Sequence, residues 1–213
     1  MSCNLIFVRH GQSLGNLNGA FLGDTDLDLS PTGYNQADCT AEFLKTRKID
    51  VIYSSDLLRA YNTALPTAKT HELDIIKCAD LRELHAGDWE NQKFDTLESD
   101  FKSTYGVWLT DIGNSHAQNG ESVADLQKRI IDAIKRIAES NDGKTVAVFT
   151  HATPIKAFFC YAYGKSLDQM KDIPWVSNAS VSEVEYNNGK FTPISYGNDS
   201  FLENLKTVLP KNC

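Results

Sequence analysis

Arg9 and His10 are the residues whose types and spacing point most directly to chemistry in this chain. They follow the apolar run Leu5 to Val8 and precede Gly11. An apolar run of this length predicts a buried strand, and a glycine after it predicts a loop. An arginine beside a histidine at a strand end suits a site that binds phosphate and uses the imidazole as a nucleophile.

Polar side chains also follow three later apolar segments. The run 51–53 ends in two serines, and Arg59 lies about one helical turn further on. The run 145–150 is followed directly by His151, and a predicted strand near residue 75 leads to Glu83. Ligands of parallel sheets bind outside the carboxyl ends of the strands. We therefore expect these side chains to meet at one edge of a sheet.

These residue types suit transfer of a phosphoryl group from a monoester. Arg9 and Arg59 could clamp the phosphoryl oxygens, and a neutral His10 could attack phosphorus if a backbone carbonyl holds its other ring N–H. His151 could donate a hydrogen bond to a phosphoryl oxygen. Glu83 could protonate the leaving oxygen and later deprotonate water, which requires that burial or nearby phosphate raise its pKa.

The elements that must position these residues alternate along the chain. Predicted strands cover residues 4–9, 51–53, 75–81, 145–150, 181–186 and 191–195. Predicted helices cover 30–48, a stretch from about 56 that is broken near Pro66, one or two stretches within 91–119, then 121–139 and 154–163. The pattern predicts an α/β fold with a mostly parallel central sheet, helices on both faces and a C-terminal antiparallel hairpin at the edge. Residues 1–213 are expected to form one domain, with 91–119 as a helical insertion over the active site.

Composition excludes several classes of partner. The net charge of −7 argues against nucleic acid, which requires a basic face. No apolar stretch reaches the length of a membrane span, and no signal peptide is recognisable. The five cysteines are scattered without a CxxC pair, which predicts reduced thiols and a cytoplasmic location. We expect a small phosphorylated substrate, no cofactor and no metal, because no metal-ligand spacing occurs.

Taken together, the motifs resemble the histidine phosphatase superfamily in its phosphoglycerate-mutase-like branch. The resemblance rests on ordered blocks that extend to about residue 164, namely Arg9-His10-Gly11-Gln12 with Asn16, Leu29-Ser30-Pro31-Thr32-Gly33, Ser54-Ser55-Asp56-Leu57-Leu58-Arg59-Ala60, Leu81-Arg82-Glu83, Gly87-Asp88-Trp89-Glu90, Asn119-Gly120-Glu121-Ser122 and the strand before His151. It implies that His10 is the phosphorylated nucleophile and Glu83 the proton donor. It also implies a phosphate pocket of Arg9, Arg59 and His151, with Asn16 as a further contact.

Further phosphate contacts are expected near these blocks. Ser13 could bond phosphate or cap its turn. Gly23 and Thr25 lie in a loop that often lines the phosphate pocket of this family. Ala152 stands where the family usually has glycine, which is tolerable unless the backbone φ must be positive.

Several alternatives stay open at this level. Asp88 or Glu90 could replace Glu83 as the acid, and His85 could enter the cleft or lie in a loop. A cofactor-dependent phosphoglycerate mutase is the second enzyme hypothesis, although 91–119 contains neither arginine nor proline, unlike the longer insertion of glycolytic mutases. A non-catalytic phospho-ligand binding protein is the third. The aromatic residues of 91–119 are interpreted as lid packing, a homodimer through a free edge strand is left open, and the tail 199–213 is expected to be partly disordered or to fold over the cleft.

Overall fold

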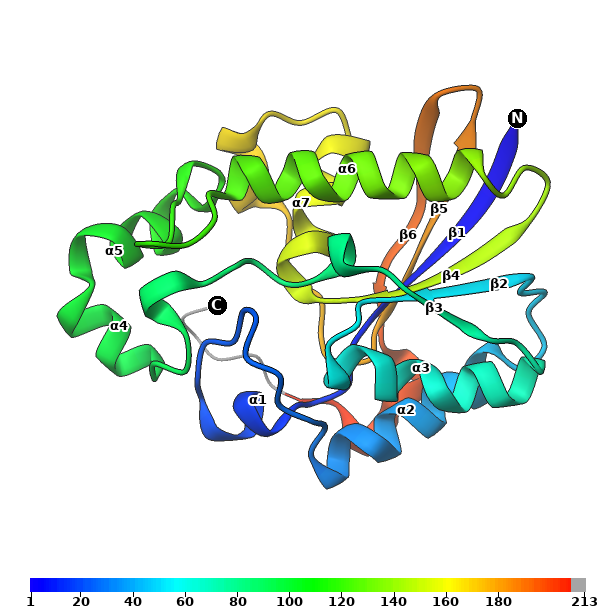
Figure 1. Ribbon diagram of the computed structural model, residues 1–213, viewed down its shortest axis with the longest axis horizontal. Helices are drawn as coiled ribbons and strands as arrows, with labels where there is room; N and C mark the ends of the chain where they lie inside the picture. Colours follow the sequence, from blue (N-terminus) through cyan, green and yellow to red (C-terminus); the bar gives the residue numbers. More distant parts are fainter. Residues whose placement is uncertain (208–213) are drawn as a thin grey trace.

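Six strands form one mixed sheet in the order β3-β2-β4-β1-β5-β6 in the computed structural model, which describes residues 1–207 (Figure 1). The strands are β1 (Ser2–Arg9), β2 (Val51–Ser54), β3 (Ile75–Lys77), β4 (Thr145–Thr150), β5 (Val181–Asn187) and β6 (Lys190–Asn198). β1 to β4 run parallel, β5 is antiparallel to β1, and β6 is antiparallel to β5. The predicted α/β class with an antiparallel hairpin at the sheet edge is confirmed.

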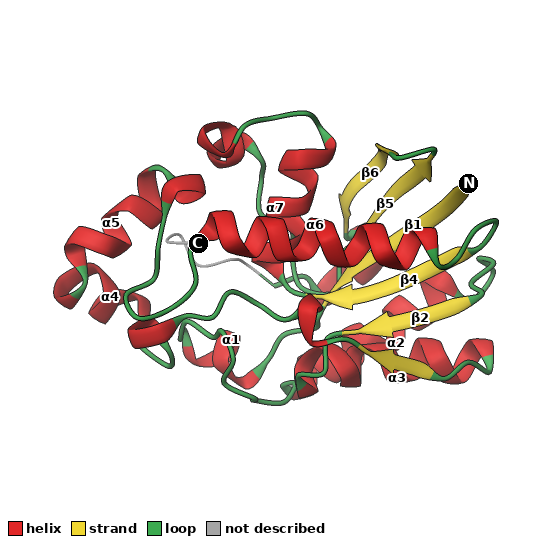
Figure 2. Ribbon diagram, turned by 45° about the horizontal axis from the view of Figure 1, so that its top comes forward, coloured by secondary structure: helices red, strands yellow, loops and turns green. Residues whose placement is uncertain are grey.

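Helices cover both faces of the sheet (Figure 2). The main ones are α2 (Pro31–Leu44) and α3 (Leu58–His71) on one face, with α6 (Val123–Glu139) and α7 (Ala152–Ala162) on the other. Side chains of β1 alternate between these layers, so Leu5 and Phe7 pack with α6 and α7, whereas Ile6 and Val8 pack with α2 and α3. Burial on both faces explains why this strand is continuously apolar.

The segment 91–119 forms a helical unit beyond the carboxyl ends of the strands, at the left of Figure 1. It contains α4 (Phe94–Asp100) and α5 (Lys102–Thr110), close to the short helix α1 (Leu14–Asn18). An apolar cluster that includes Trp89, Tyr105 and Trp108 joins this unit to α7. The helices expected in this segment are therefore present, and packing fixes them over the sheet edge.

Some element boundaries differ from the sequence prediction. α3 runs through Pro66, because its small buried face, formed by residues such as Ala60, Ala64 and Ala68, packs on the sheet and outweighs one missing backbone hydrogen bond. β3 stops at Lys77, where its pairing with β2 ends, and a single 3₁₀ turn (Ala79–Leu81) follows. α2 ends at Leu44 instead of near 48.

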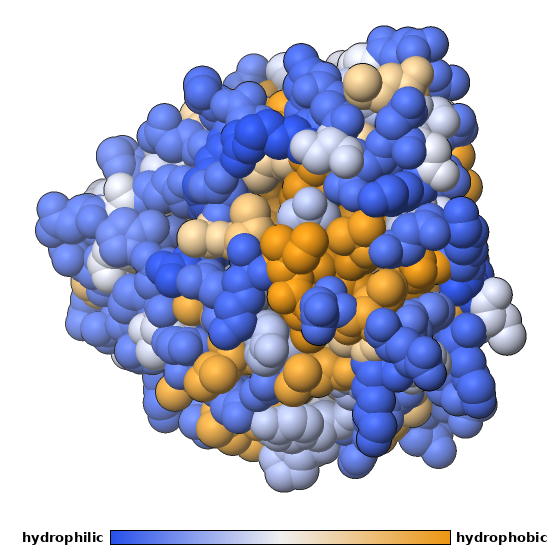
Figure 3. Space-filling model, turned by 45° about the vertical axis from the view of Figure 1, so that its right-hand side comes forward, coloured by the Kyte–Doolittle hydropathy of each residue, from blue (hydrophilic) through white to orange (hydrophobic). Residues whose placement is uncertain are grey.

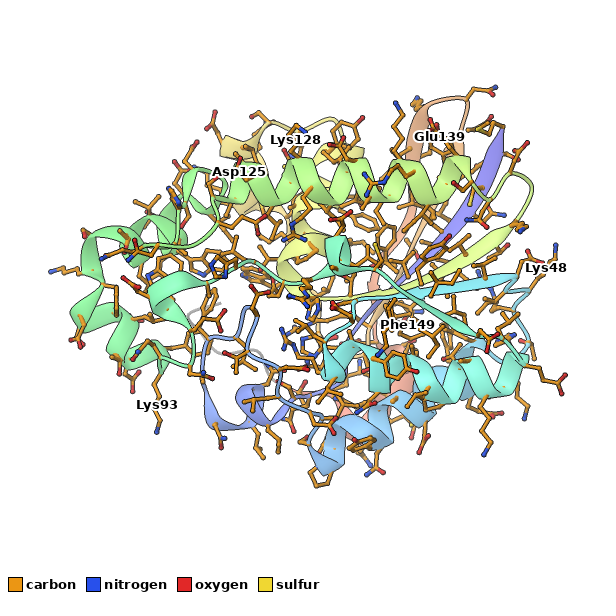
Figure 4. All side chains as sticks on the ribbon, in the orientation of Figure 1. Lys48, Lys93, Asp125, Lys128, Glu139 and Phe149 are labelled. Carbon is orange, nitrogen blue, oxygen red and sulfur yellow. The ribbon has the colours of Figure 1, made fainter. Side chains whose placement is uncertain are left out.

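Figure 3 shows one face of the molecule, on which hydrophilic residues surround an apolar area. In Figure 4 the labelled Lys128 projects from α6 into solvent, whereas the labelled Phe149 lies between the sheet and α3. No helix within residues 1–207 is both long and apolar enough to cross a membrane. Of the tail, a 3₁₀ helix (Ser200–Leu205) packs on α2, and residues 208–213 lie outside the described part.

Candidate active site

A cavity opens at the carboxyl ends of β1 and β4, under α4 and α5. Its polar end includes four of the side chains predicted for phosphate chemistry, Arg9, His10, Arg59 and Glu83, and its outer walls are apolar and aromatic. Its lining residues are Arg9, His10, Ser13, Asn16, Ala20, Phe21, Leu22, Arg59, Glu83, Phe94, Trp108, Ala152, Thr153 and Trp175. Residues from widely separated segments therefore meet at the sheet edge where the strand order predicted a ligand site.

His10 is held in the tautomer that a nucleophile requires. Its Nδ1 lies 2.7 Å from the carbonyl oxygen of Gly11, which can only accept, so Nδ1 carries the proton and Nε2 has the free lone pair. Burial, together with the cations Arg59 and Arg9, holds the pKa of His10 well below its usual value. The imidazole is therefore neutral at physiological pH, as the sequence reasoning required.

The loop after His10 is shaped by close backbone packing. A Cβ on Gly11 would lie 2.6 Å from the carbonyl oxygen of Gly33, at the start of α2, so only glycine fits. Ser13 caps α1 by accepting a hydrogen bond from the Asn16 N–H, and Asn16 Oδ1 accepts from the Ser13 N–H, both at 3.1 Å. The capping role of Ser13 is therefore real, and both side chains also line the cavity.

Two guanidinium groups stand beside His10. Arg9 donates from Nη1 to the carbonyl of Val176. Arg59 is 1% exposed and donates from Nη1 to the Thr25 carbonyl at 2.8 Å and from Nη2 to the Gly23 carbonyl at 2.7 Å. Burial lowers the pKa of Arg59 to about 10, so the group stays positively charged near neutral pH.

The structure places Gly23 and Thr25 behind Arg59, not on the cavity wall. Neither is among the described lining residues, because their carbonyls are directed at the guanidinium. Their expected contacts with phosphate therefore stay a prediction, and what the structure shows is that this loop holds Arg59 in place.

His151 is likewise set behind the cavity lining. Its Nδ1 accepts from Arg59 Nε at 3.2 Å, so Nε2 carries the proton and lies 2.8 Å from the hydroxyl oxygen of Ser55. The His10 and His151 rings are 5.1 Å apart between centroids. Burial holds the pKa of His151 well below its usual value. Both ring nitrogens of His151 are engaged in this arrangement, so its predicted hydrogen bond to a phosphoryl oxygen would require the contact with Ser55 to be exchanged and stays a prediction.

Glu83 is a buried carboxyl group on the cavity wall. It is 8% exposed and lines the cavity, and its two oxygens accept from the backbone N–H groups of Leu84 at 2.8 Å and Thr153 at 3.2 Å. Burial raises the pKa of Glu83, outweighing these hydrogen bonds and the nearby Arg59. Thr153 is in the first turn of α7, directly after Ala152, whose backbone φ is not positive.

The alternative acids lie elsewhere. Asp88 accepts a hydrogen bond from Asn119 at 3.0 Å and is not among the described lining residues. Glu90 accepts from the N–H groups of Gly23 and Asp24, at 3.1 and 2.6 Å, and from the Thr25 hydroxyl at 2.7 Å. Its carboxylate therefore organises the loop that holds Arg59.

Two further expectations concern residues around the site. His85 pairs with Asp24 at 2.9 Å, is half exposed, and is outside the described cavity lining. Phe94 and Trp108 pack in the apolar cluster of 91–119, and they also line the cavity, together with Trp175. Among residues 1–207, no three His, Cys, Asp or Glu side chains are grouped so as to hold a metal ion.

A supporting segment was not predicted. Asn178 donates to the carbonyl of His10 at 3.2 Å and to Oδ1 of Asn16 at 3.1 Å, and the Ala179 N–H also donates to the His10 carbonyl, at 3.1 Å. With Val176 accepting from Arg9, this stretch before β5 clamps the catalytic loop. No local motif marks these residues, because their role depends on the pairing of β5 with β1.

Fold and site together define an α/β phosphatase that is built around a neutral histidine between two arginines. The sequence matches the histidine phosphatase superfamily (branch 1) over residues 5–199, and the chain belongs to this family. It is a hydrolase of phosphate monoesters, as the resemblance of its motifs implied.

Characterised relatives agree with this assignment. The chain is 32% identical to phosphoserine phosphatase 1 of Hydrogenobacter thermophilus, over 84% of this chain and 85% of that protein. It is 30% identical to the metal-independent phosphoserine phosphatase of Arabidopsis thaliana, over 94% and 84%. A mutant phosphoserine phosphatase from Entamoeba histolytica, solved in complex with phosphoserine, superimposes with a TM-score of 0.84 at 25% identity, over 94% of this chain and 99% of that one.

Proposed function

We propose that the protein hydrolyses small phosphate monoesters through a phosphohistidine on His10, without a metal ion. One observation carries this proposal, namely the hydrogen bond from His10 Nδ1 to the Gly11 carbonyl. It leaves Nε2 as the free nucleophilic nitrogen of a residue that lines the cavity. The flanking charges of Arg9 and Arg59 suit a transition state with negative charge spread over three oxygens.

In the first half-reaction, His10 Nε2 forms a bond to phosphorus as the bond to the leaving oxygen breaks. Glu83 gives its proton to that oxygen, and the raised pKa of Glu83 supplies the protonated form. Arg9, Arg59 and the Asn16 amide hold the phosphoryl oxygens. His151 acts here as a positioning residue, because its Nδ1 orients Arg59.

In the second half-reaction, the ionised Glu83 takes a proton from water. The water oxygen attacks phosphorus, the N–P bond of phosphohistidine breaks, and His10 returns to the neutral form as inorganic phosphate leaves. The Gly11 carbonyl stabilises the imidazolium character that develops while phosphorus is attached.

His10→Ala tests the nucleophile directly. The variant should fold normally and lose turnover of phenyl phosphate. Glu83→Gln removes the acid of the first half-reaction and the base of the second. With phenyl phosphate, whose leaving group needs less protonation than a serine alkoxide, the second step should be slowed more, so mass spectrometry of this variant should find a phosphoryl group on His10. Full activity of His10→Ala would refute the proposal. Tight phosphate binding without turnover by the unaltered protein would instead favour the hypothesis of a non-catalytic phospho-ligand binding protein.

Phosphoserine is the first substrate to test, because the relatives reported above carry that activity in their names. A second candidate is an ester with an apolar leaving group. It is favoured by the outer walls of the cavity, where the described residues beyond the phosphate end are uncharged. Comparing kcat/KM for phosphoserine and phenyl phosphate at one pH separates the two, and a wider screen should include sugar phosphates and phosphoglycerates.

The mutase alternative is less well supported. The residues that 91–119 contributes to the cavity, Phe94 and Trp108, carry no positive charge for the second phosphate of a bisphosphate. Supplying 3-phosphoglycerate with 2,3-bisphosphoglycerate should therefore release inorganic phosphate faster than it forms the isomer. The opposite order of rates would establish the mutase.

The wider setting is also proposed. We propose one domain over 1–213 in which 91–119 acts as a lid, supported by the family match across residues 5–199 and by the packing of this segment on α7. A cytoplasmic location is supported by four cysteines that are free in the described part, Cys3, Cys39, Cys78 and Cys160. A homodimer through the edge strand β6 remains a proposal, which sedimentation of the protein tests.

A further inference from the structure

A buried cation lies next to the active site without a carboxylate partner in the described part of the chain. Lys156 points from α7 into the protein and is 3% exposed. Its ammonium donates to the carbonyl of Ile173 and lies 4.7 Å from the ring centroid of Trp175. Within residues 1–207, no carboxylate oxygen is within 4 Å of this ammonium. A buried charge is costly unless it is paired, and burial lowers the pKa of Lys156 to about 8, so the ammonium form still dominates at pH 7 and an anion beside it would stabilise that form.

Lys156 also lines a second cavity, of about 200 Å³, which shares two lining residues, Trp108 and Trp175, with the active-site cavity. Lys171 provides a second positive charge at this cavity, and the remaining walls are apolar or aromatic. They are formed by Trp108, Leu109, Ile112, Ile173, Pro174 and Trp175. Two cations against apolar walls match a ligand that has a negative head and an apolar body.

We propose that this cavity, here called the lysine pocket, binds a small monocarboxylate with an aromatic or aliphatic body. Lys156 would pair with the carboxylate, and the indole of Trp175 would stack on the body. Asp172 adds negative charge close to Lys156, which favours a singly charged ligand over a dianion such as phosphate. The size of the cavity limits the body to about one ring, since drug-sized ligands occupy roughly 300 Å³ or more.

The lysine pocket shares Trp108 and Trp175 with the active-site cavity. The indole N–H of Trp108 is buried and has no hydrogen-bond partner among the described residues, so the wall shared by the two cavities contains an unused hydrogen-bond donor. A ligand that holds Trp108 or Trp175 in one position would also change the wall of the active-site cavity that these indoles form. Occupancy of the pocket should therefore alter the KM of the phosphatase, and substrate should alter ligand affinity by the same factor when both are measured as binding.

Calorimetric titration with benzoate tests the site, with saturating inorganic phosphate present to block Arg9 and Arg59. We expect saturable binding with a Kd of about 1 mM. Benzamide, which has the shape without the charge, and acetate, which has the charge without the ring, should each bind at least about tenfold more weakly. If saturable benzoate binding is absent with saturating phosphate and appears only when phosphate is left out, benzoate occupies the active site and the proposal is overturned.

Lys156→Met keeps the unbranched apolar stem and removes the charge. It should weaken benzoate binding at least about tenfold, whereas the matched control Lys128→Met, on the exposed face of α6, should leave it unchanged. If Lys156→Met does not fold, Lys171→Glu at the cavity rim should weaken binding on its own. Equal benzoate affinity in these variants would refute the assignment.

The benzoate titration is independent of the proposed function, because it can also be carried out with His10→Ala. The measurement of KM rests on that function. In the active protein, benzoate should change KM at least about twofold, and this change should disappear in Lys156→Met. Binding without any change in KM would overturn the coupling through the shared indoles.

Discussion

Glu90 offers a sharp test of how this site is held together. Its carboxylate accepts from the N–H groups of Gly23 and Asp24 and from Thr25, and the carbonyls of Gly23 and Thr25 accept in turn from Arg59. Glu90→Gln keeps the shape but replaces one accepting oxygen with an NH₂ group that faces N–H donors. A hydrogen bond to a charged group contributes about 1.5–3 kcal/mol, so we expect the loop to lose about 2 kcal/mol.

If that loss reaches the transition state through Arg59, kcat/KM should fall about 30-fold, since 1.36 kcal/mol corresponds to a factor of ten. The assay is hydrolysis of phenyl phosphate, paired with urea unfolding. Glu98→Gln, on the exposed side of α4, serves as the matched control and should change neither quantity. The affinity for inorganic phosphate should fall with kcat/KM, because Arg59 also holds the product. A folded Glu90→Gln protein with full kcat/KM and unchanged phosphate affinity would refute the positioning role.

Three further predictions follow from the same geometry. Arg59→Lys should lower kcat/KM by about 100-fold or more, because an ammonium cannot bond the Gly23 and Thr25 carbonyls together with His151; steady-state kinetics check this. The raised pKa of Glu83 means that the acid form is lost as pH rises through it, so kcat/KM should fall on the alkaline side, and Glu83→Gln should abolish that limb of the pH–rate profile. His10 and His151 have lowered pKa values and stay neutral when folded, whereas unfolded histidines take up protons below about pH 6.5, so stability is lost as pH falls through that value. From about pH 7 to 5.5 the two rings should together cost up to about 2.5 kcal/mol in urea unfolding. That measurement uses the Glu83→Gln background, since the raised pKa of Glu83 shifts stability with the opposite sign, and a flat profile there would contradict the neutral assignment.

Much of the architecture is legible in the sequence because it is carried by local patterns. The apolar stripe of α6 falls at three- and four-residue steps, and Ser122 caps it by accepting from the Asp125 N–H. Asn188-Gly189 sets the turn between β5 and β6. The predicted break of α3 near Pro66 was wrong, because packing of the buried face of the helix outweighs the hydrogen bond that proline cannot make. Its effect could not be judged without the buried face on which α3 lies.

Some residues of the candidate site were predictable from local patterns in the sequence, and others were not. His10, Arg9, Arg59 and Glu83 were predictable from their places at strand ends and in ordered motifs, and all four line one cavity. The sequence contains no sign that Asn178 holds the catalytic loop. Its contact with His10 spans 168 positions and exists only because β5 pairs with β1.

The sequence by itself determined which candidate groups for phosphoryl transfer the chain carries and the order of the elements that position them. It could do so because residue type and hydrophobic period act over short distances along the chain. Tertiary structure decided the tautomer of His10, the raised pKa of Glu83 and the placement of His151 behind Arg59. These properties depend on burial and on partners brought from distant segments, and no local pattern encodes either. The same holds for Lys156, which reads as an ordinary helix lysine until folding buries it beside Trp175.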